Sequence, residues 1–346
     1  MMNSQSIIKR PNGGLWQATA SLLFLLATMS PVQGQESTVY AVVTATKLFV
    51  VGAANPSTGL FFQHPSEDSV WHHSGPNNYR AFGFAQGARS KGRVLYVAAG
   101  NGVHKSTDAG AHWKNTTGWG ITEVLSVCPD SEDSNIVYCA TPYGVMKSAD
   151  GCHSWMPVNK GLNALFTCSV IVDRSDHNTV YCATEDGAYV SNDGAATWRR
   201  LGLSVSNTRV ISQHPVRPEI LAVGTENDGI YISTNGGRWW TKSEAGVDHQ
   251  TFYAIVFDPT NPDVMYAGGY VTGVYKSTDG GKSWKRMNNG LSVLNIHSLA
   301  VDPRNSRRVY AGAYWGGVFR SDDAGGSWHW VGLPDSQVWS IVIQPN

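Results

Sequence analysis

One eight-residue motif recurs six times along this chain of 346 residues. In outline it reads S-x-D-x-G-x-x-W, which is a serine, an aspartate, a glycine and a closing tryptophan. A fixed period in the forties, filled with short apolar runs and turns, is typical of a β-propeller, and the serines here are 42, 43, 42, 44 and 44 residues apart. The copies are STDAGAHW (106–113), SADGCHSW (148–155), SNDGAATW (191–198), STNGGRWW (233–240), STDGGKSW (277–284) and SDDAGGSW (321–328).

Each repeat contains four apolar runs with Gly, Asp, Asn or Pro between them, the pattern of one four-stranded blade. The last unit shows it clearly, as NIHSLAVDP, RRVYAGAY, GGVFRSDDAGGSW and HWVGLP. A seventh, decayed copy fits residues 66–71, after the expected strands KLFVVGA and GLFFQ. We therefore expect an all-β chain, with residues 35–346 forming a single seven-bladed β-propeller of four-stranded antiparallel blades.

The end of the chain predicts how the ring closes. The final residues, VWSIVIQPN, match the first strand of a unit. Such a strand can pair with the N-terminal blade and remove its open edge. It could replace the N-terminal strand VYAVVTA or lie beside it, and the sequence does not decide between these two arrangements.

The repeated motif has the composition of a hairpin that holds itself in shape. Asp and Ser side chains can bond nearby backbone N–H groups, and Gly supplies positive φ. We expect each copy to join the third strand of a blade to the fourth, with its Trp packed under the turn. The motif therefore indicates a structural role.

The pattern resembles the Asp-box, or BNR repeat, of sialidases, sortilin-type receptors, xyloglucanase-type glycoside hydrolases and photosystem II assembly factors. Asn235 replaces the acid in one copy, and Cys152 and Ala195 replace the expected Gly in two others. The resemblance covers residues 40–346 and implies a WD40/YVTN/BNR-like propeller. It implies little about activity, because one fold carries many functions.

The N-terminus has the pattern of a secretory signal peptide. Lys9 and Arg10 precede the apolar run ATASLLFLLATM (18–29), and small residues follow near Gly34. The run is shorter than the ~20 residues of a membrane-spanning helix, although a retained anchor is the alternative. We expect residues 1–34 to be removed, leaving a secreted or periplasmic protein with no stable membrane span.

The composition limits the classes of partner that we expect. The formal net charge is zero, with no basic block, so we expect no nucleic-acid partner. Of the five Cys, Cys139 and Cys182 occupy a slot that other repeats fill with Ala, which predicts small buried residues, with disulfide pairing as the alternative. No motif indicates a cofactor or metal; we interpret His72 and His73 as a solvated loop pair, with metal binding as the alternative.

Candidate ligand-binding residues follow from the propeller prediction. Ligands bind propellers at the mouth of the central channel, where the innermost strands begin. Counting six residues back from the Pro, or its equivalent, that ends each such strand gives one position per blade. This position varies between repeats, whereas the positions two and four residues later stay apolar, as expected if the first faces a ligand. The candidates are Glu123, Cys168, Arg209, Tyr253, His297 and Trp339, with Arg80 as the counterpart in the second blade.

Catalysis is the alternative to binding. Glycoside hydrolysis needs two carboxylates, and Glu185, Asp186, Glu226 and Asp228 lie in turns of neighbouring blades. Xyloglucanase-type enzymes place a catalytic Asp in a turn of the first of two tandem propellers, but the corresponding turn here, 54–58, contains no acid. Sialidases use three Arg, a Tyr and a Glu, and this ring lacks the third Arg. Neither set of catalytic residues transfers, so no catalytic residue is assigned.

Three functions remain open at this point. The first is an exported, non-catalytic and monomeric propeller that binds a polysaccharide or a protein partner through its mouth and loops. The second is a glycan-active hydrolase or lyase that uses the same mouth. The third is an assembly factor resembling the photosystem II family, for which the balanced charge offers no basic face.

Overall fold

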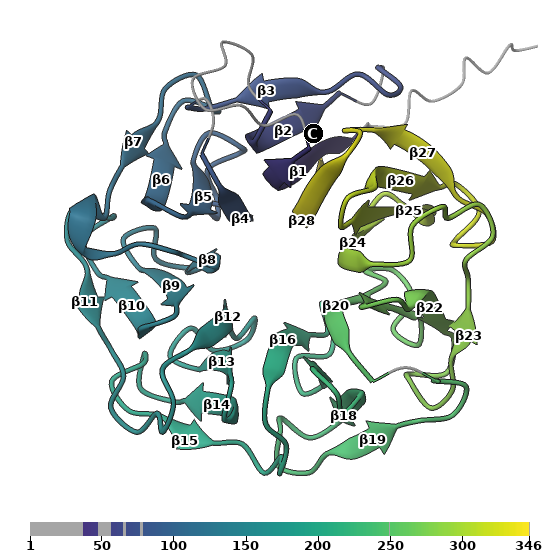
Figure 1. The fold of residues 1–346 in the computed structure, drawn as a ribbon. Coiled ribbons are helices and arrows are strands. Elements are labelled where there is room, and N and C mark those ends of the chain that lie inside the picture. The colour runs from purple at the N-terminus through teal and green to yellow at the C-terminus, as the bar shows by residue number, and fades with distance from the viewer. Residues whose placement is uncertain (1–36, 48–56, 65–66, 77–78, 249, 346) are drawn as a thin grey trace, which may run out of the picture. The chain divides into compact units, whose positions relative to one another are not determined.

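The computed structural model describes residues 37–47, 57–64, 67–76, 79–248 and 250–345. These residues form seven four-stranded antiparallel sheets around a central axis (Figure 1), so the seven-bladed propeller is confirmed. The helix η1 (Gly118–Gly120) is one 3-10 turn, and no helix among the described residues is long and apolar enough to cross a bilayer. The expected signal peptide, 1–34, lies outside the described residues and stays a prediction.

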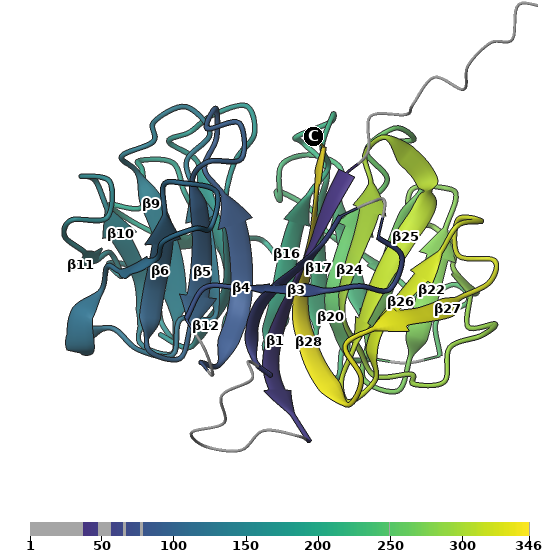
Figure 2. The same ribbon diagram turned by 90° about the horizontal axis from the view of Figure 1, so that it is seen from above.

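Blade 1 combines both ends of the described chain. From the axis outward it contains β28 (Ser336–Pro345), β1 (Ser37–Thr46), β2 (Gly59–Gln63) and β3 (His72–Ser74). β28 runs antiparallel to β1, with Thr38 opposite Gln344 and Thr46 opposite Ser336 (Figure 2). The closing strand therefore lies beside the N-terminal strand, on its axis side. Of the strand expected at KLFVVGA, Lys47 is in a turn and the remaining residues lie outside the described ones.

Each of the other blades takes four consecutive strands, and the first of the four lies nearest the axis. Blade 2 is β4 (Ala81–Gln86), β5 (Leu95–Ala99), β6 (Gly102–Ser106) and β7 (Lys114–Asn115); blade 3 is β8 (Ser126–Pro129), β9 (Val137–Thr141), β10 (Gly144–Ser148) and β11 (Met156–Pro157). Blade 4 is β12 (Thr167–Val172), β13 (Val180–Thr184), β14 (Gly187–Ser191) and β15 (Arg199–Arg200); blade 5 is β16 (Thr208–Gln213), β17 (Leu221–Thr225), β18 (Ile230–Ser233) and β19 (Thr241–Ser243). Blade 6 is β20 (Phe252–Phe257), β21 (Met265–Gly269), β22 (Gly273–Ser277) and β23 (Lys285–Arg286); blade 7 is β24 (Ile296–Asp302), β25 (Asn305–Ala313), β26 (Gly317–Ser321) and β27 (His329–Gly332).

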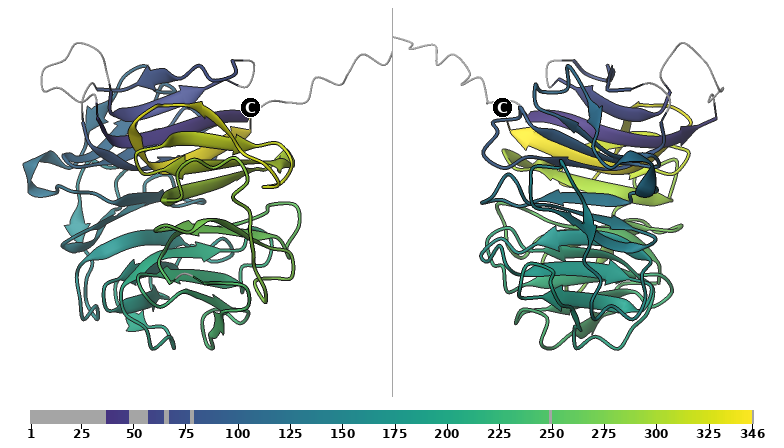
Figure 3. Two further views of the ribbon diagram at one scale, coloured as in Figure 1. Left: turned by 45° about the vertical axis from the view of Figure 1, so that its right-hand side comes forward. Right: turned by 90° about the vertical axis from the view of Figure 1, so that its left-hand side faces the viewer.

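The core lies between blades. One cluster joins Tyr266 and Val274 of blade 6 to Val309, Phe319 and Trp328 of blade 7. Side views show the sheets layered against one another (Figure 3). Because both faces of a blade pack on neighbours, the second strands are buried along their whole length in blades 2 to 6.

The cysteines follow the same packing. Cys139 and Cys182 are fully buried in the second strands of blades 3 and 4, as expected for the small-residue slot. All five thiols are free, which leaves the disulfide alternative without support. Burial raises the pKa of Cys128 to about 11, so this thiol stays protonated at neutral pH.

The repeated motif forms the hairpin between the third and fourth strands of blades 2 to 7. In the copy at 277–284, Ser277 Oγ donates to Asp279 Oδ1 at 2.8 Å and accepts from Gly281 N at 2.8 Å. Asp279 also accepts from the backbone N of Ser283 at 2.9 Å and from its Oγ at 2.5 Å. The polar side chains therefore hold the hairpin as expected.

The tryptophans do more than support their own turns. Trp113 and Trp240 donate to carbonyls of their own hairpins, Gly110 and Gly237. Four other tryptophans reach beyond their own hairpins, because their Nε1 atoms donate to the preceding blade. These bonds run from Trp71 to Val331 O (2.8 Å), Trp198 to Val158 O (2.6 Å), Trp284 to Ser243 Oγ (2.7 Å) and Trp328 to Met287 O (2.7 Å).

The backbones of neighbouring blades also touch beside these indoles. Trp284 N donates to Ala245 O at 2.8 Å, and a Cβ added to Gly246 would lie 2.0 Å from Trp284 O. Gly246 has φ +79°, a region that other residues rarely adopt. Trp328 and Gly290 repeat this arrangement between blades 6 and 7. The motif therefore holds one blade against the next as well as shaping a hairpin.

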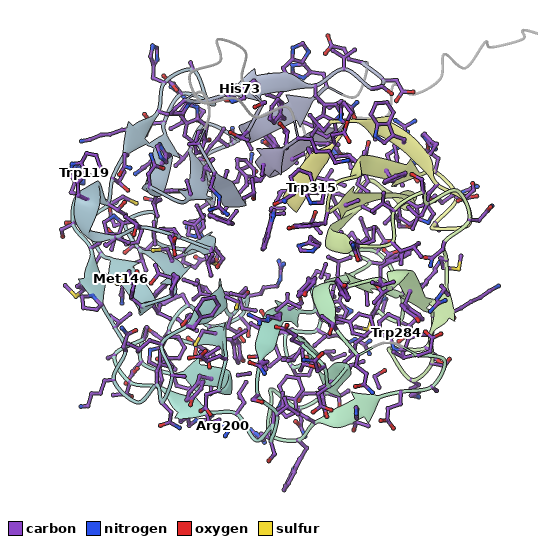
Figure 4. The ribbon with its side chains drawn as sticks, viewed as in Figure 1. His73, Trp119, Met146, Arg200, Trp284 and Trp315 are labelled. Atoms are coloured by element: carbon purple, nitrogen blue, oxygen red, sulfur yellow. The ribbon has the colours of Figure 1, made fainter. Side chains whose placement is uncertain are left out.

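We expect Trp284→Ala to lower the free energy of unfolding by about 3–5 kcal/mol, the usual cost of truncating a large buried side chain. Trp284 is only 5% exposed and packs between blades 5 and 6 (Figure 4). Trp239→Ala is the matched control, because Trp239 is 77% exposed in a neighbouring hairpin and should change stability by less than about 0.5 kcal/mol. Equal effects of the two substitutions in urea unfolding would contradict the inter-blade role.

We expect Asp279→Asn to destabilise the propeller at neutral pH and to lose this effect in acid. Hydrogen bonds from the Ser283 hydroxyl and backbone lower the pKa of Asp279 to about 2, so its stabilising contribution is present above the unfolded value of about 3.9 and lost toward pH 2. In the copy at 233–240, Asn235 stands in place of the aspartate, and its amide oxygen still accepts from the Ser233 hydroxyl and from the backbone N–H of Trp239. Melting temperatures of variant and native protein should converge as the pH falls; a constant difference would refute this explanation.

Candidate functional site

One end of the central channel, called the mouth here, is formed where the seven innermost strands begin. Cys168, Arg209, Tyr253 and His297 are the second residues of β12, β16, β20 and β24, and Trp339 lies in β28. The ladder to the next strand skips each of these five residues, as in a β-bulge. A bulge re-aims the side chain of the extra residue, so each of these five blades brings one side chain to the mouth.

The expected positions in blades 2 and 3 are wrong. In β4 the ladder skips Phe82, so Phe82 and not Arg80 corresponds to Tyr253. In blade 3, Ser126 pairs with Ala140 as Ser169 pairs with Ala183, which makes Leu125 the equivalent of Cys168. In blade 3 the error came from counting back from Pro129, which precedes the buried Asp130. In blades 6 and 7 the proline instead follows the equivalent buried aspartate, as Pro259 follows Asp258 and Pro303 follows Asp302. Arg80 and Glu123 thus precede the bulge position by two residues and are exposed.

Aromatic rings from four successive blades meet at the mouth. The ring of His297 lies 4.6 Å from Tyr253 and 4.9 Å from Trp339, and Trp339 lies 5.7 Å from Phe82. Tyr314 stacks on His297 at 4.9 Å, and Trp315 lies 5.6 Å from Tyr314. We name this set the aromatic arc: Tyr253, His297, Tyr314, Trp315, Trp339 and Phe82. Trp339, one of the arc residues predicted from the sequence, is 36% exposed.

The arc carries no charge at neutral pH. Burial among the rings lowers the pKa of His297 to about 4, so its imidazole is neutral. Burial also raises the pKa of the Tyr253 phenol. The arc therefore presents ring faces and edges with a few neutral hydrogen-bonding atoms.

Arg209 lies at one end of the aromatic arc and forms an ion pair. Its guanidinium forms an ion pair with Glu226 and donates to Cys168 Sγ at 3.5 Å. Burial raises the pKa of Cys168, so the acceptor is a thiol. Glu226, one of the four loop acids, is thus occupied by a mouth residue.

Two more of the four loop acids also have hydrogen-bond partners. Asp186 accepts from Tyr189 Oη at 2.5 Å and from Asn163, and this bonding lowers its pKa. Asp228 accepts from Tyr231 Oη at 3.1 Å and from Lys242 Nζ at 3.0 Å. A general acid in glycoside hydrolysis needs a raised pKa, so Asp186 does not suit that role.

Arg80 and Glu123 line a separate hollow beside the arc. It has a volume of about 300 Å³. The Arg80 guanidinium lies over the Phe82 ring, 5.5 Å from its centre. The lining residues are Tyr79, Arg80, Phe82, Gly100, Asn101 and Glu123.

The histidine pair lies away from the mouth. His72 and His73 belong to the outermost strand β3, so the expected loop is wrong. His72 Nε2 is 2.5 Å from Glu67 Oε2, and His73 Nε2 is 3.1 Å from Thr58 O. Within the ranges that the structure describes, no three His, Cys, Asp or Glu side chains are grouped so that they could hold a metal ion.

Sequence reasoning missed Phe82, Leu125, Tyr314 and Trp315. Aligning the strands on the buried Asp instead of on Pro would have found Leu125. Tyr314 and Trp315 lie in the loop between β25 and β26. This loop lies at the mouth because β25 runs antiparallel to β24 and ends opposite its first residue, Ile296. The adjacent aromatic pair was the available signal.

We expect His297 to titrate near pH 4 in an NMR titration of the imidazole resonances, against about 6.5 for an ordinary histidine. Between about pH 6.5 and pH 4 the unfolded chain protonates this histidine and the folded protein does not. The free energy of unfolding should therefore be unaffected by His297 above about pH 6.5 and should fall as the pH is lowered toward 4. Trp339→Ala should open the ring contact at 4.9 Å and move the pKa back toward the ordinary value. Titration of the native protein near 6.5 would contradict the buried arc.

No family model matches the sequence, and neither does any curated protein. Solved structures do. The GH74 xyloglucanase from Xanthomonas campestris aligns with a TM-score of 0.65 at 16% identity, over 85% of this chain and 52% of that one. A GH74 enzyme from Niastella koreensis aligns with 0.61 at 20% identity, over 74% and 47%. YCF48 bound to a D1 peptide aligns with 0.59 at 13% identity, over 79% and 95%.

These likenesses concern the fold. The chain spans about half the length of the GH74 enzymes that it matches. Its neighbours include enzymes and a protein solved with a peptide, so the fold by itself does not separate catalysis from binding. Together with the seven four-stranded sheets, these likenesses show that the chain has a β-propeller fold.

Proposed function

We propose that this protein is a non-catalytic propeller that binds a glycan at its mouth. The aromatic arc is the observation that carries the proposal. Small-molecule and sugar sites are lined by aromatic side chains with a few placed polar groups, and the arc offers this surface next to the hollow at Arg80. The neutral His297 adds a hydrogen-bonding atom without a charge.

Binding is favoured over hydrolysis by the state of the acids. Asp186, Glu226 and Asp228 each hold a Tyr, Arg or Lys partner, and a carboxylate held in this way is poorly placed to donate a proton or to activate water. A glycan-active enzyme is the alternative, because one of the solved structures with a similar fold is a GH74 xyloglucanase.

A protein partner is the second candidate. Tyr143 and Tyr270 are well exposed in loops that join second to third strands, at the same end of the channel as the arc. Exposed tyrosines are frequent at protein interfaces. YCF48, a neighbour in fold, was solved with a D1 peptide.

We further propose that binding takes place outside the cytoplasm. The basic and apolar pattern over residues 1–34 supports export by a signal peptide. Detection of the mature protein in the secreted or periplasmic fraction, with its N-terminus near residue 35, would test this location.

We expect Trp339→Ala to weaken glycan binding at least tenfold, which corresponds to about 1.4 kcal/mol. Trp330→Ala is the matched control, because Trp330 is 49% exposed on the outermost strand β27 and away from the mouth. A glycan array identifies the ligand, calorimetry measures its affinity, and released reducing sugar reports hydrolysis. Unchanged affinity in Trp339→Ala, or hydrolysis of the bound glycan, would overturn the proposal.

A further inference from the structure

The hollow beside the aromatic arc contains a charged group without an internal partner. Arg80 forms no ion pair with any described residue, and its guanidinium lies over the Phe82 ring. Arg209, the other arginine at the mouth, is neutralised by Glu226. Arg80 is therefore the one mouth arginine available to a ligand within the described part of the chain.

The Arg80 guanidinium carbon lies 5.5 Å from the centre of the Phe82 ring, a cation–π contact that leaves its N–H donors unused. The N–H groups of a guanidinium form the fork that matches a carboxylate. The backbone beneath is held as well, because Arg80 O accepts from Gly100 N at 2.8 Å. The donor is thus positioned before a ligand arrives.

The rest of the hollow suits a sugar ring. At about 300 Å³ it lies at the lower end of small-molecule pockets, which fits one ring and not a folded peptide. Glu123, on the same lining, can accept hydrogen bonds from hydroxyl groups. Phe82 belongs to both the hollow and the arc, so a chain on the arc can place one residue in the hollow.

We propose that the glycan carries a carboxylate, as a uronic acid residue, and that Arg80 binds it. This inference rests on the proposed function, because the neighbouring sugars of the same chain lie on the arc. Glu123 accepts the hydroxyl groups of the uronate, while Phe82 and Trp339 contact its rings. Arg80 is thus a specificity-determining residue that separates acidic from neutral glycans.

The test uses the propeller with matched pairs of oligosaccharides. Oligomers of galacturonate, mannuronate and guluronate are each compared by calorimetry with their carboxyl-reduced, uncharged counterparts, and a neutral β-glucan oligomer is included. We expect at least one acidic oligomer to bind about tenfold or more tightly than its reduced form, as for one charge-assisted bond. Arg80→Gln should abolish that preference while leaving the affinity for the reduced form unchanged.

Two further variants separate the contributions. Arg199→Gln removes the same charge from the exposed outermost strand β15 and should keep the preference. Trp339→Ala should weaken the acidic and reduced forms alike. If acidic and reduced oligomers bind equally, or Arg80→Gln keeps the preference, the carboxylate inference is wrong and glycan binding stands. If none of these oligosaccharides binds, the carboxylate inference is wrong, and the glycan array decides separately whether glycan binding stands.

Discussion

The packing of each blade on the next is the interaction on which the whole propeller depends. A four-stranded sheet of short strands buries too little apolar surface to be stable alone, so both of its faces need neighbours. Apolar clusters fill the space between blades, and the indoles of Trp198, Trp284 and Trp328 bond to the preceding blade near the outside of the ring. At the axis, β28 pairs with β1 and completes the first blade, whose two faces pack on blades 7 and 2. The outer edges are protected differently, by strands of two residues rich in Lys and Arg in blades 2, 4 and 6.

The same arrangement explains why the mouth can carry chemistry. The innermost strands start at one end of the channel, and in blades 1, 2 and 4 to 7 a bulge there releases one residue from the hydrogen-bonded ladder. Side chains at a bulge are not needed for pairing, so their identity is free to differ while the apolar positions that follow hold the blades together. In blades 6, 7, 1 and 2 these residues are rings in contact, which gives the mouth a neutral aromatic side. The Arg209–Glu226 pair and the hollow at Arg80 lie at its two ends.

Part of this site could be predicted from the sequence. Counting back along the first strands reached the bulge residue in five blades, because that residue comes six positions before the end point of the count in each of them. These five residues are Cys168, Arg209, Tyr253, His297 and Trp339. The count failed in blades 2 and 3, where proline does not follow the buried aspartate or is absent, and so Phe82 and Leu125 were missed. Arg80 and Glu123 were chosen for the wrong reason, yet both line the hollow next to Phe82. Which charges pair could not be predicted, since Arg209 meets Glu226 across a turn whose shape is set by the sheet.

By itself, the sequence determined the number of blades, the strand order within blades 2 to 7 and the hairpins, because turn chemistry and the alternation of side chains act over a few neighbouring residues. Only the tertiary structure decided that the closing strand lies inside β1, that four indoles reach across to the preceding blade, and that Trp339 meets both His297 and Phe82. Each of these depends on atoms from different blades, including blades from opposite ends of the chain. Such contacts exist only once the ring has closed, because no local rule in the sequence specifies the distance between two blades.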